Sequence, residues 1–371
     1  MEMQWQKLDV NLEKGTLLDE GRDVSSLHFE CQRIRVGCAV LRAGIVGHVF
    51  TLEERRGQGL GRIVMEDTLR RMEARRHDIA YLFGIPHYYV KFGYTTVQHY
   101  YGTVLDLARV QPKPVAGFRA RRMRRQDLSA VMRLYEGDNR ARAGAFVRDR
   151  RYWTRGAASR GMDQGICCLD ARGRLAGYAK WGGQFFHARM VAAELLDRAL
   201  VVPEVATTSA ASAGALLHEL AQMAGRQERS ALIFLGPPDH ALSAAMYELG
   251  GQQRRSVMPA GGVQARIIRF MPLMEKLQAE FSALYQQSAL CGRRAEATVL
   301  TPMGGVRIAA SGRQVRVSAA SRGGLSMSAQ ELVAHIFGFG PPPEAPGASG
   351  LLLRTVFPQR TAHSWPLDEP A

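Results

Sequence analysis

Cysteines are few in this chain of 371 residues, and long apolar runs are absent. The five cysteines form no Cys-x-x-Cys pair, and adjacent Cys167 and Cys168 are poorly placed for a disulfide with each other. This pattern argues against a disulfide framework and a zinc site, and it predicts free thiols in a reducing compartment. No apolar run reaches the ~18 residues that cross a bilayer, and residues 1–7 lack an apolar signal core. We therefore expect a cytoplasmic protein with no membrane partner and no metal.

Acidic side chains are scarce relative to basic ones, because 34 Asp and Glu stand against 49 Lys and Arg, for a formal net charge of +15. A basic surface attracts anionic partners, which include nucleic acid, phosphate-bearing cofactors and acidic surfaces. The arginines are dispersed along the chain, however, and their local cluster at 119–125 is not interleaved with aromatic residues. A nucleic-acid-binding protein is therefore the less favoured alternative.

Two common phosphate-binding motifs are missing, but another glycine-rich turn is present. No Walker lysine with Ser or Thr follows Gly61, and no Gly-x-Gly-x-x-Gly joins a strand to a helix. Instead, the strand-like run 44–51 leads to a turn and then to a helical pattern. The turn reads Arg55-Arg56-Gly57-Gln58-Gly59-Leu60-Gly61-Arg62.

This turn has the features of an anion-binding loop. Backbone N–H groups at a helix N-terminus, together with the helix dipole, hold phosphate groups. Gly59 and Gly61 let the backbone approach an anion closely, and Arg56 and Arg62 add positive charge. The loop therefore predicts a site for a diphosphate-bearing cofactor; the alternative is a turn that only joins a strand to a helix.

The pattern of elements predicts a mixed α/β (α+β) protein with three units, at residues 1–115, 116–270 and 271–371. Proline-broken residues 111–114 indicate the first boundary. The second unit repeats the order of the first, but residues 201–208 stand where the glycine loop would be and contain no glycine or arginine. In the third unit we predict a helix at 273–285, strands at 305–309 and 314–319, a helix at 328–337 with a serine cap, and a loop from 339 to 350.

Several motifs together resemble a known family. Val49-Phe50-Thr51 followed by Arg56-Gly57-Gln58-Gly59-Leu60-Gly61 resembles the acyl-CoA loop of GNAT acetyltransferases, and Tyr89-Val90-Lys91-Phe92-Gly93-Tyr94 resembles their later Tyr-x-x-Phe-Gly-Tyr segment. Residues 139–153 are similar to the second, degenerate acetyltransferase domain of Eis-type (enhanced intracellular survival) proteins, and residues 357–368 resemble their C-terminal sterol-carrier-protein-like domain. The resemblance covers nearly the whole chain. It implies tandem GNAT-type domains followed by a sterol-carrier-like domain, with the first domain lacking its usual N-terminal strand and helices.

The resemblance implies transfer of an acetyl group from acetyl-CoA to a primary amine of a small-molecule acceptor by direct attack. Main-chain groups of Val49 and Thr51 would hold the pantetheine arm and the acetyl carbonyl, and the loop would hold the pyrophosphate. Tyr89 would protonate the departing thiolate, and the C-terminal carboxylate, on Ala371 in this chain, would help to remove the amine proton. The cofactor-binding residues are then Val49, Thr51, Arg56, Gly57, Gln58, Gly59, Leu60, Gly61 and Arg62. Members of the family form multimers, so a homo-oligomer is implied as well.

Other residues near these motifs have two interpretations each. His48 and His87 flank the motifs and are candidates for a base or a substrate contact, although a lone histidine is more often structural. Tyr89 has the alternative role of an aromatic packed beside Tyr88 and Phe92. A further alternative for the whole chain is an acyl-CoA-binding scaffold without catalytic activity, because the expected N-terminal elements are missing.

Overall fold

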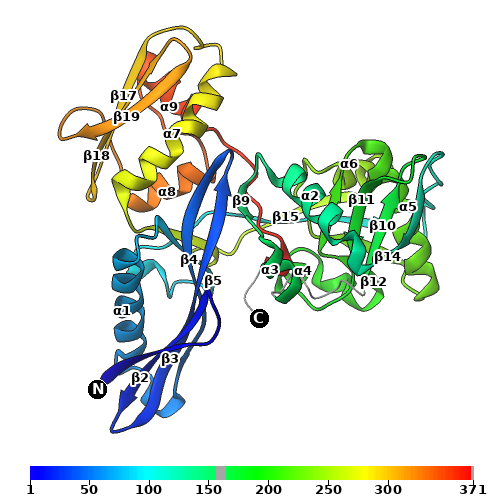
Figure 1. Cartoon of the computed structure of the whole chain (residues 1–371), viewed down its shortest axis with the longest axis horizontal. Helices are drawn as coiled ribbons and strands as arrows, with labels where there is room; N and C mark the ends of the chain where they lie inside the picture. Colours follow the sequence, from blue (N-terminus) through cyan, green and yellow to red (C-terminus); the bar gives the residue numbers. More distant parts are fainter. Residues whose placement is uncertain (156–163, 369–371) are drawn as a thin grey trace.

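A computed structural model of the chain describes residues 1–155 and 164–368 (Figure 1). The mixed α/β fold is as predicted, and the described residues form four sheets. Figure 1 shows the first sheet and the C-terminal unit on one side and the sheets that contain β10 (Gly165–Leu169) and β14 (Ala231–Phe234) on the other. Within the described ranges, no helix has both the length and the apolar composition needed to cross a membrane.

The first sheet is mostly an antiparallel meander, covered on one face by α1 (Leu60–Ala74). Its strands in order are β1 (Glu2–Lys7), β2 (Leu12–Asp19), β3 (Arg22–Val36), β4 (Ala39–Thr51), β5 (Ile79–Gly84), β16 (Gly262–Ile267) and β6 (Thr95–Thr96), with β9 (Ala143–Phe146) paired to the end of β3. The predicted apolar stripe of α1 is confirmed, since Met65 and Met72 are fully buried in one cluster with Leu27 and Phe29 of β3. Alternate residues of β3 therefore face α1, and the residues between them face the opposite side of the sheet.

Two further sheets of four strands are built from strands between residues 100 and 256. We call these two sheets and the helices between their strands the second half of the fold. One sheet has the order β13 (Glu204–Thr207), β11 (Leu175–Lys180), β10 (Gly165–Leu169) and β8 (Arg119–Arg122); the other has β12 (Ala199–Val202), β14 (Ala231–Phe234), β7 (Tyr100–Asp106) and β15 (Gln252–Ser256). The helices of this half are α2 (Leu128–Asn139), α3 (Arg150–Arg155), α4 (Phe186–Ala192), α5 (Ala210–Arg226) and α6 (Ala241–Glu248). In the first sheet, β4 precedes α1 and pairs in parallel with β5, the strand after that helix. Here β12 and β13 precede α5, and β12 likewise pairs in parallel with β14, the strand after α5.

The two halves exchange strands across the predicted boundaries. Strand β7, from the first predicted unit, pairs with β14 and β15 in the second half. In return, β16 from the second unit pairs with β5 and β6 in the first sheet. Residues 115 and 270 therefore divide the sequence but do not separate the sheets. The exchange ties the halves together through main-chain hydrogen bonds.

The C-terminal unit is a four-stranded sheet with three helices. Its elements are α7 (Phe270–Gln286), β17 (Ala295–Thr301), β18 (Gly304–Ser311), β19 (Gln314–Ala320), β20 (Leu325–Ser326), α8 (Ala329–Phe337) and α9 (Gly347–Val356). The predicted helices, strands and serine cap are confirmed, and Ser328 accepts a hydrogen bond from the Glu331 N–H. The predicted loop is wrong at its end, because α9 begins at Gly347, within it.

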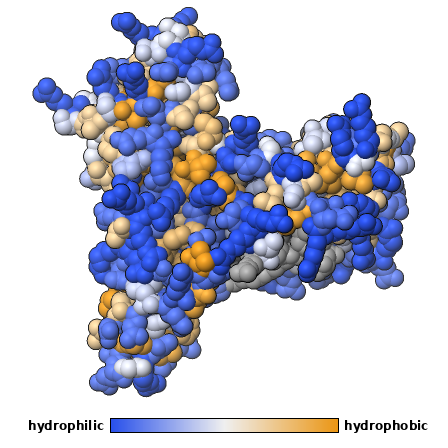
Figure 2. Space-filling model, viewed as in Figure 1, coloured by the Kyte–Doolittle hydropathy of each residue, from blue (hydrophilic) through white to orange (hydrophobic). Residues whose placement is uncertain are grey.

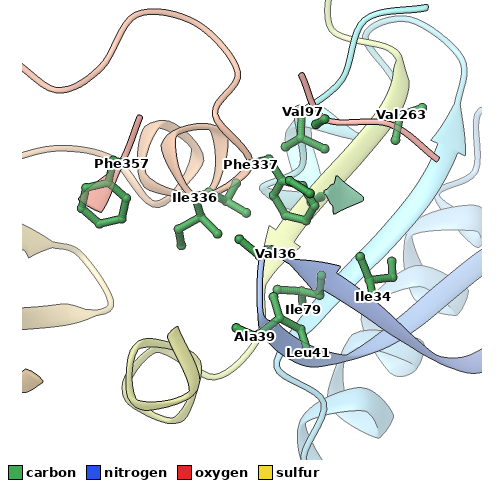
Figure 3. Packing of buried hydrophobic residues seen from close by; sticks show 14 of the residues in the cluster. Ile34, Val36, Ala39, Leu41, Ile79, Val97, Val263, Ile336, Phe337 and Phe357 are labelled. Atoms are coloured by element: carbon green, nitrogen blue, oxygen red, sulfur yellow. The ribbon is translucent and has the colours of Figure 1, made fainter. Parts of the chain in front are cut away.

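The C-terminal unit shares a core with the first sheet. Figure 3 shows Ile336 and Phe337 of α8 beside Val36 and Ile79. The rings of Phe337 and Tyr81 lie 6.0 Å apart. The apolar contact of α8 with the sheet fixes the C-terminal unit against the face of the sheet opposite α1.

The surface of the molecule is mainly polar on the side in view. Figure 2 shows that hydrophilic residues cover most of this face and that hydrophobic residues form small patches.

Candidate active site

Strands β4 and β5 run parallel and then stop pairing. Their paired positions run from Ala43↔Ile79 to Val46↔Leu82, while β4 continues five residues further to Thr51. Over that extension β4 pairs only with β3, and a bulge interrupts the register between Ser26 and His28 of β3. The main chain of Gly47–Thr51 therefore has one edge that β5 does not satisfy, which is where a ligand can hydrogen-bond to it.

The predicted strand residues Val49 and Thr51 lie on this extension. Both are half-buried, and Thr51 Oγ1 is 2.9 Å from Ser25 Oγ. Ser25 Oγ also donates to the Phe50 carbonyl oxygen at 2.8 Å. These contacts hold the extension in place on the side of β3. His48, between the last paired residue and Val49, has a positive φ of 50°, which is uncommon outside glycine.

The glycine loop follows immediately and opens α1. Gly57 and Gly59 have φ of +81° and +79°, and a Cβ built on either would meet no atom within 4 Å. Gly59 is the N-cap of α1; no side chain caps the helix, and its first turn contains no acidic residue. The N-terminal N–H groups of α1 therefore lie beside open space with the positive end of the helix dipole, as an anion site requires.

The other loop residues are divided between surface and core. Arg56 and Arg62 are exposed, and Arg56 makes only a long contact of 3.6 Å with Glu53. Gln58 accepts a hydrogen bond from Arg55 Nε at 3.0 Å. Leu60 is 2% exposed and belongs to the core under α1, so only its main chain is free to face a ligand.

Helix α5 in the second half provides an internal comparison. It occupies the position of α1 in its own half, but its N-terminus is closed by a capping box of Ser209 and Ser212. Ser209 Oγ accepts from the Ser212 N–H at 3.2 Å. The N–H groups that α1 leaves to a ligand are thus partly satisfied within α5 itself.

Tyr88 lies on the loop at Gly61, and sequence reasoning missed it. A Cβ on Gly61 would lie 2.6 Å from the Tyr88 hydroxyl oxygen and 3.5 Å from Thr51 Oγ1. Lys91 Nζ lies 4.1 Å from the centroid of the Tyr88 ring. The only sequence signal for Tyr88 was its place next to Tyr89, because its contact with Gly61 joins two segments that are distant in the chain.

Tyr89 packs behind Tyr88. It is 8% exposed, its ring lies over Gly84, and ring centroids place it 4.9 Å from Tyr88 and 6.1 Å from Tyr94. Burial raises the pKa of Tyr89 to about 12. Tyr89 is therefore a protonated phenol at neutral pH, next to the end of β5.

The chain's last described residues are fixed against the first sheet. Ser364 Oγ lies 2.7 Å from the Tyr81 hydroxyl of β5, and Asp368 is fully buried. Arg148 Nε donates to Asp368 Oδ1 at 2.8 Å, and the Tyr152 hydroxyl donates to the same oxygen at 3.0 Å. The predicted catalytic carboxylate on Ala371 lies outside the described residues, three positions beyond this anchor.

A histidine pair lies on the sheet face opposite α1. His28 of β3 and His48 of β4 have ring centroids 4.6 Å apart. Burial, then the charges of His48 and Lys14, lower the pKa of His28. Burial raises the pKa of Glu30, two residues along β3, and the nearby Asp368 carboxyl adds to this shift. This face therefore holds an imidazole of lowered pKa, His28, near a carboxyl group of raised pKa, Glu30.

His87 and the metal prediction complete the list of sequence candidates. His87 is exposed, has a φ of 62° and donates its N–H to the Ala260 carbonyl oxygen at 2.9 Å. Among residues 1–155 and 164–368, no group of three or more His, Cys, Asp and Glu side chains is placed to hold a metal ion.

Comparisons with known proteins agree with this geometry. Residues 4–97 match the acetyltransferase (GNAT) domain family, whose fold uses acetyl-CoA as its acyl donor. No curated protein matches the chain.

Solved structures extend the likeness in fold to almost the whole chain. A GCN5-related N-acetyltransferase from Anabaena variabilis superposes with a TM-score of 0.72 at 15% identity, over 97% of this chain and 90% of that one. One from Kribbella flavida gives 0.70 at 17% identity, over 97% and 87%. Eis1 from Mycobacterium abscessus gives 0.63 at 15% identity, over 94% and 88%.

Proposed function

We propose that this protein is an acetyl-CoA-dependent N-acetyltransferase that acts on a primary amine of a small molecule. One observation carries the proposal: an uncapped, open glycine turn that begins α1 follows the extension of β4, Gly47–Thr51, which does not pair with β5. An anion site and an unsatisfied strand edge thus lie next to each other. A molecule that has both a diphosphate and an amide-bearing arm matches that pair of features.

The residues present fit the cofactor. The main chain of Gly57, Gly59 and Gly61 would bind the pyrophosphate at the N-terminus of α1, with Arg56 and Arg62 supplying charge from the exposed side. Main-chain groups of Val49 and Thr51 would bind the pantetheine arm and polarise the acetyl carbonyl. Acetyl-CoA supplies the acetyl thioester that the amine attacks.

Tyr89 is proposed as the general acid. As the new C–N bond forms and the C–S bond breaks, the Tyr89 hydroxyl would give its proton to the sulfur. The raised pKa keeps this proton on the phenol at neutral pH. Tyr88 is the neighbouring hydroxyl and lies on the loop itself, so its role must be tested in parallel.

Two groups are candidates to accept the amine proton. One is the C-terminal carboxylate of Ala371, which the resemblance implies and which the burial of Asp368 would hold near the first sheet. The other is the His28–His48 pair, whose imidazoles lie beside the β4 extension. The His28–His48 pair lies on the face opposite α1, so we place the acceptor amine there.

The finer family assignment is also a proposal. We propose that α7–α9 form a sterol-carrier-like unit, because their four-stranded sheet packs its helices around a filled apolar core. A homo-oligomer is proposed from the resemblance alone, and a cytoplasmic location from the free cysteines and the lack of long apolar runs. Light scattering after gel filtration measures the oligomeric state.

The test is a matched pair of variants, Tyr89→Phe and Tyr88→Phe. With acetyl-CoA and a panel of amines, Tyr89→Phe should lower kcat by about 100-fold or more, the usual range for a general acid, while acetyl-CoA affinity stays unchanged. Tyr88→Phe should retain most of the rate. The roles are reversed if only Tyr88→Phe loses activity. Binding of acetyl-CoA without CoA release on any amine would indicate a scaffold instead of an enzyme.

A further inference from the structure

A second cavity lies away from the acetyl site, where three parts of the chain meet. It has a volume of about 400 Å³ and lies between the start of β7, strand β15, the loop after α8 and the tail at 359–362. None of its lining residues belongs to β4, β5 or the glycine loop. Whatever this cavity binds is therefore separate from the proposed acetyl-CoA site.

The side chains that line the cavity include many hydrogen-bond donors and no carboxylate. Arg254, Arg255 and Arg360 all line it. Arg254 pairs with Glu194, and Arg360 Nη1 donates to Glu280 Oε1 at 2.8 Å, but neither acid lines the cavity. Arg255 is exposed and has no ion pair among the residues that the structure describes. The cavity therefore contains one uncompensated positive charge.

Arg255 faces an aromatic wall. Burial, and then the charge of Arg255, lower the pKa of His99, so its imidazole is neutral at physiological pH. The rings of His99 and Phe339 are tilted by 31° with centroids 4.7 Å apart, and the Tyr101 hydroxyl lies 3.3 Å from His99 Nδ1. These rings line the same cavity as the Arg255 guanidinium group, and Arg255 is paired in register with Tyr101.

Gln98 belongs to the base of the cavity. It is 2% exposed, and its Oε1 accepts the Ser364 N–H at 2.8 Å. Its Nε2 is buried as well and has no hydrogen-bond partner among the described residues. The polar group open to a ligand is therefore the exposed guanidinium of Arg255.

We propose that this cavity binds a small organic anion that carries a flat ring. The anionic group pairs with Arg255, and the ring packs on His99 and Phe339. The chemistry of the wall selects a carboxylate, sulfonate or phosphate on an aromatic group, and it disfavours a cation. The proposal does not depend on the acetyl-transfer reaction.

Calorimetric titration with 8-anilinonaphthalene-1-sulfonate tests the proposal, because this probe combines a flat ring with a fixed negative charge. Wild-type protein should bind one equivalent, and the variants Arg255→Ser and Phe339→Ser should each weaken binding at least tenfold. Arg172→Ser, which alters an exposed arginine in a turn far along the sequence, is the control and should bind like wild type. Thermal melts of each variant verify that it is folded.

Excess coenzyme A separates this cavity from the acetyl site. The probe should remain bound when coenzyme A is added, because the two sites share no residue. Displacement by coenzyme A, no binding to wild-type protein, or equal affinity in Arg255→Ser and Phe339→Ser would each overturn the proposal.

Discussion

Replacing Arg148 by methionine should destabilise the protein strongly, because Arg148 is the shared cation of two buried carboxylates. Its side chain is fully buried, with Nη2 2.7 Å from Glu204 Oε2 and Nε 2.8 Å from Asp368 Oδ1. Lys180 Nζ lies 3.7 Å from Glu204 Oε1 and is the second cation. Burial opposes the charge on Glu204, but Arg148 and Lys180 outweigh it and hold the pKa of Glu204 below its usual value.

The magnitude follows from these distances. At 2.7 Å and an effective dielectric constant of about 20, one ion pair gains about 6 kcal/mol before desolvation is counted. Burying the ions cancels much of this gain, but deleting one partner leaves the others buried and unpaired, which costs about 3–5 kcal/mol. For Asp368, burial already raises the pKa despite the contact with Arg148, so Asp368 will take up a proton when Arg148 is absent.

Urea unfolding at pH 7 measures the effect. Arg148→Met should lower the free energy of unfolding by about 3–5 kcal/mol, and Arg172→Met, at an exposed site, should change it by about 0.5 kcal/mol or less. The deficit should shrink at lower pH, because protonation removes the unpaired charges. A triple variant that adds Glu204→Gln and Asp368→Asn should recover much of the loss.

Two results would refute this reasoning. One is an Arg148→Met protein within about 1 kcal/mol of wild type, which is the size of an exposed ion pair. The other is a deficit that stays constant with pH. Because Asp368 anchors the tail to the first sheet, we also expect the variant to lose acetyl transfer if the C-terminal carboxylate takes part.

The remaining predictions concern the loop and a buried histidine. Gly59→Val should weaken acetyl-CoA binding in calorimetry, since the φ of +79° disfavours a branched residue. Gly61→Ala should lower the free energy of unfolding by about 1 kcal/mol, and Tyr88→Phe should restore it, because the other neighbours, Thr51 Oγ1 at 3.5 Å and Tyr88 Cζ at 3.9 Å, are at ordinary contact distance; equal costs in both backgrounds would contradict this. Burial lowers the pKa of His187 to about 4, below its unfolded value, so protonation of this histidine favours the unfolded chain. Between pH 7 and 5 the free energy of unfolding should therefore fall by about 2 kcal/mol because of His187. The His187→Gln variant should not show this part of the decrease.

Local features of the sequence predicted the loop well. Glycines with positive φ, an apolar stripe on α1 and a serine cap on α8 depend on residues within one or two turns of each other, so they can be inferred from spacing. The same is true of the strand-to-helix order. The predicted residues Val49, Thr51 and Gly59 accordingly lie in adjacent segments of one strand, loop and helix.

Contacts between distant segments could not be predicted in this way. The exchange of β7 and β16 crosses the expected boundaries, because strand pairing depends on edges that meet only in the folded chain. Tyr88 reaches Gly61 from another loop, and His28 meets His48 across two strands. None of these pairs leaves a pattern in a single sequence.

By itself, the sequence determined the glycine turn and the helix that it opens, since backbone conformation and helix polarity are local properties. Only the tertiary structure decided which hydroxyl lies on that loop, that the tail is held by buried Arg148, and that a second, donor-lined cavity exists. The reason is physical: burial, desolvation and side-chain contact depend on what the rest of the chain places around each residue.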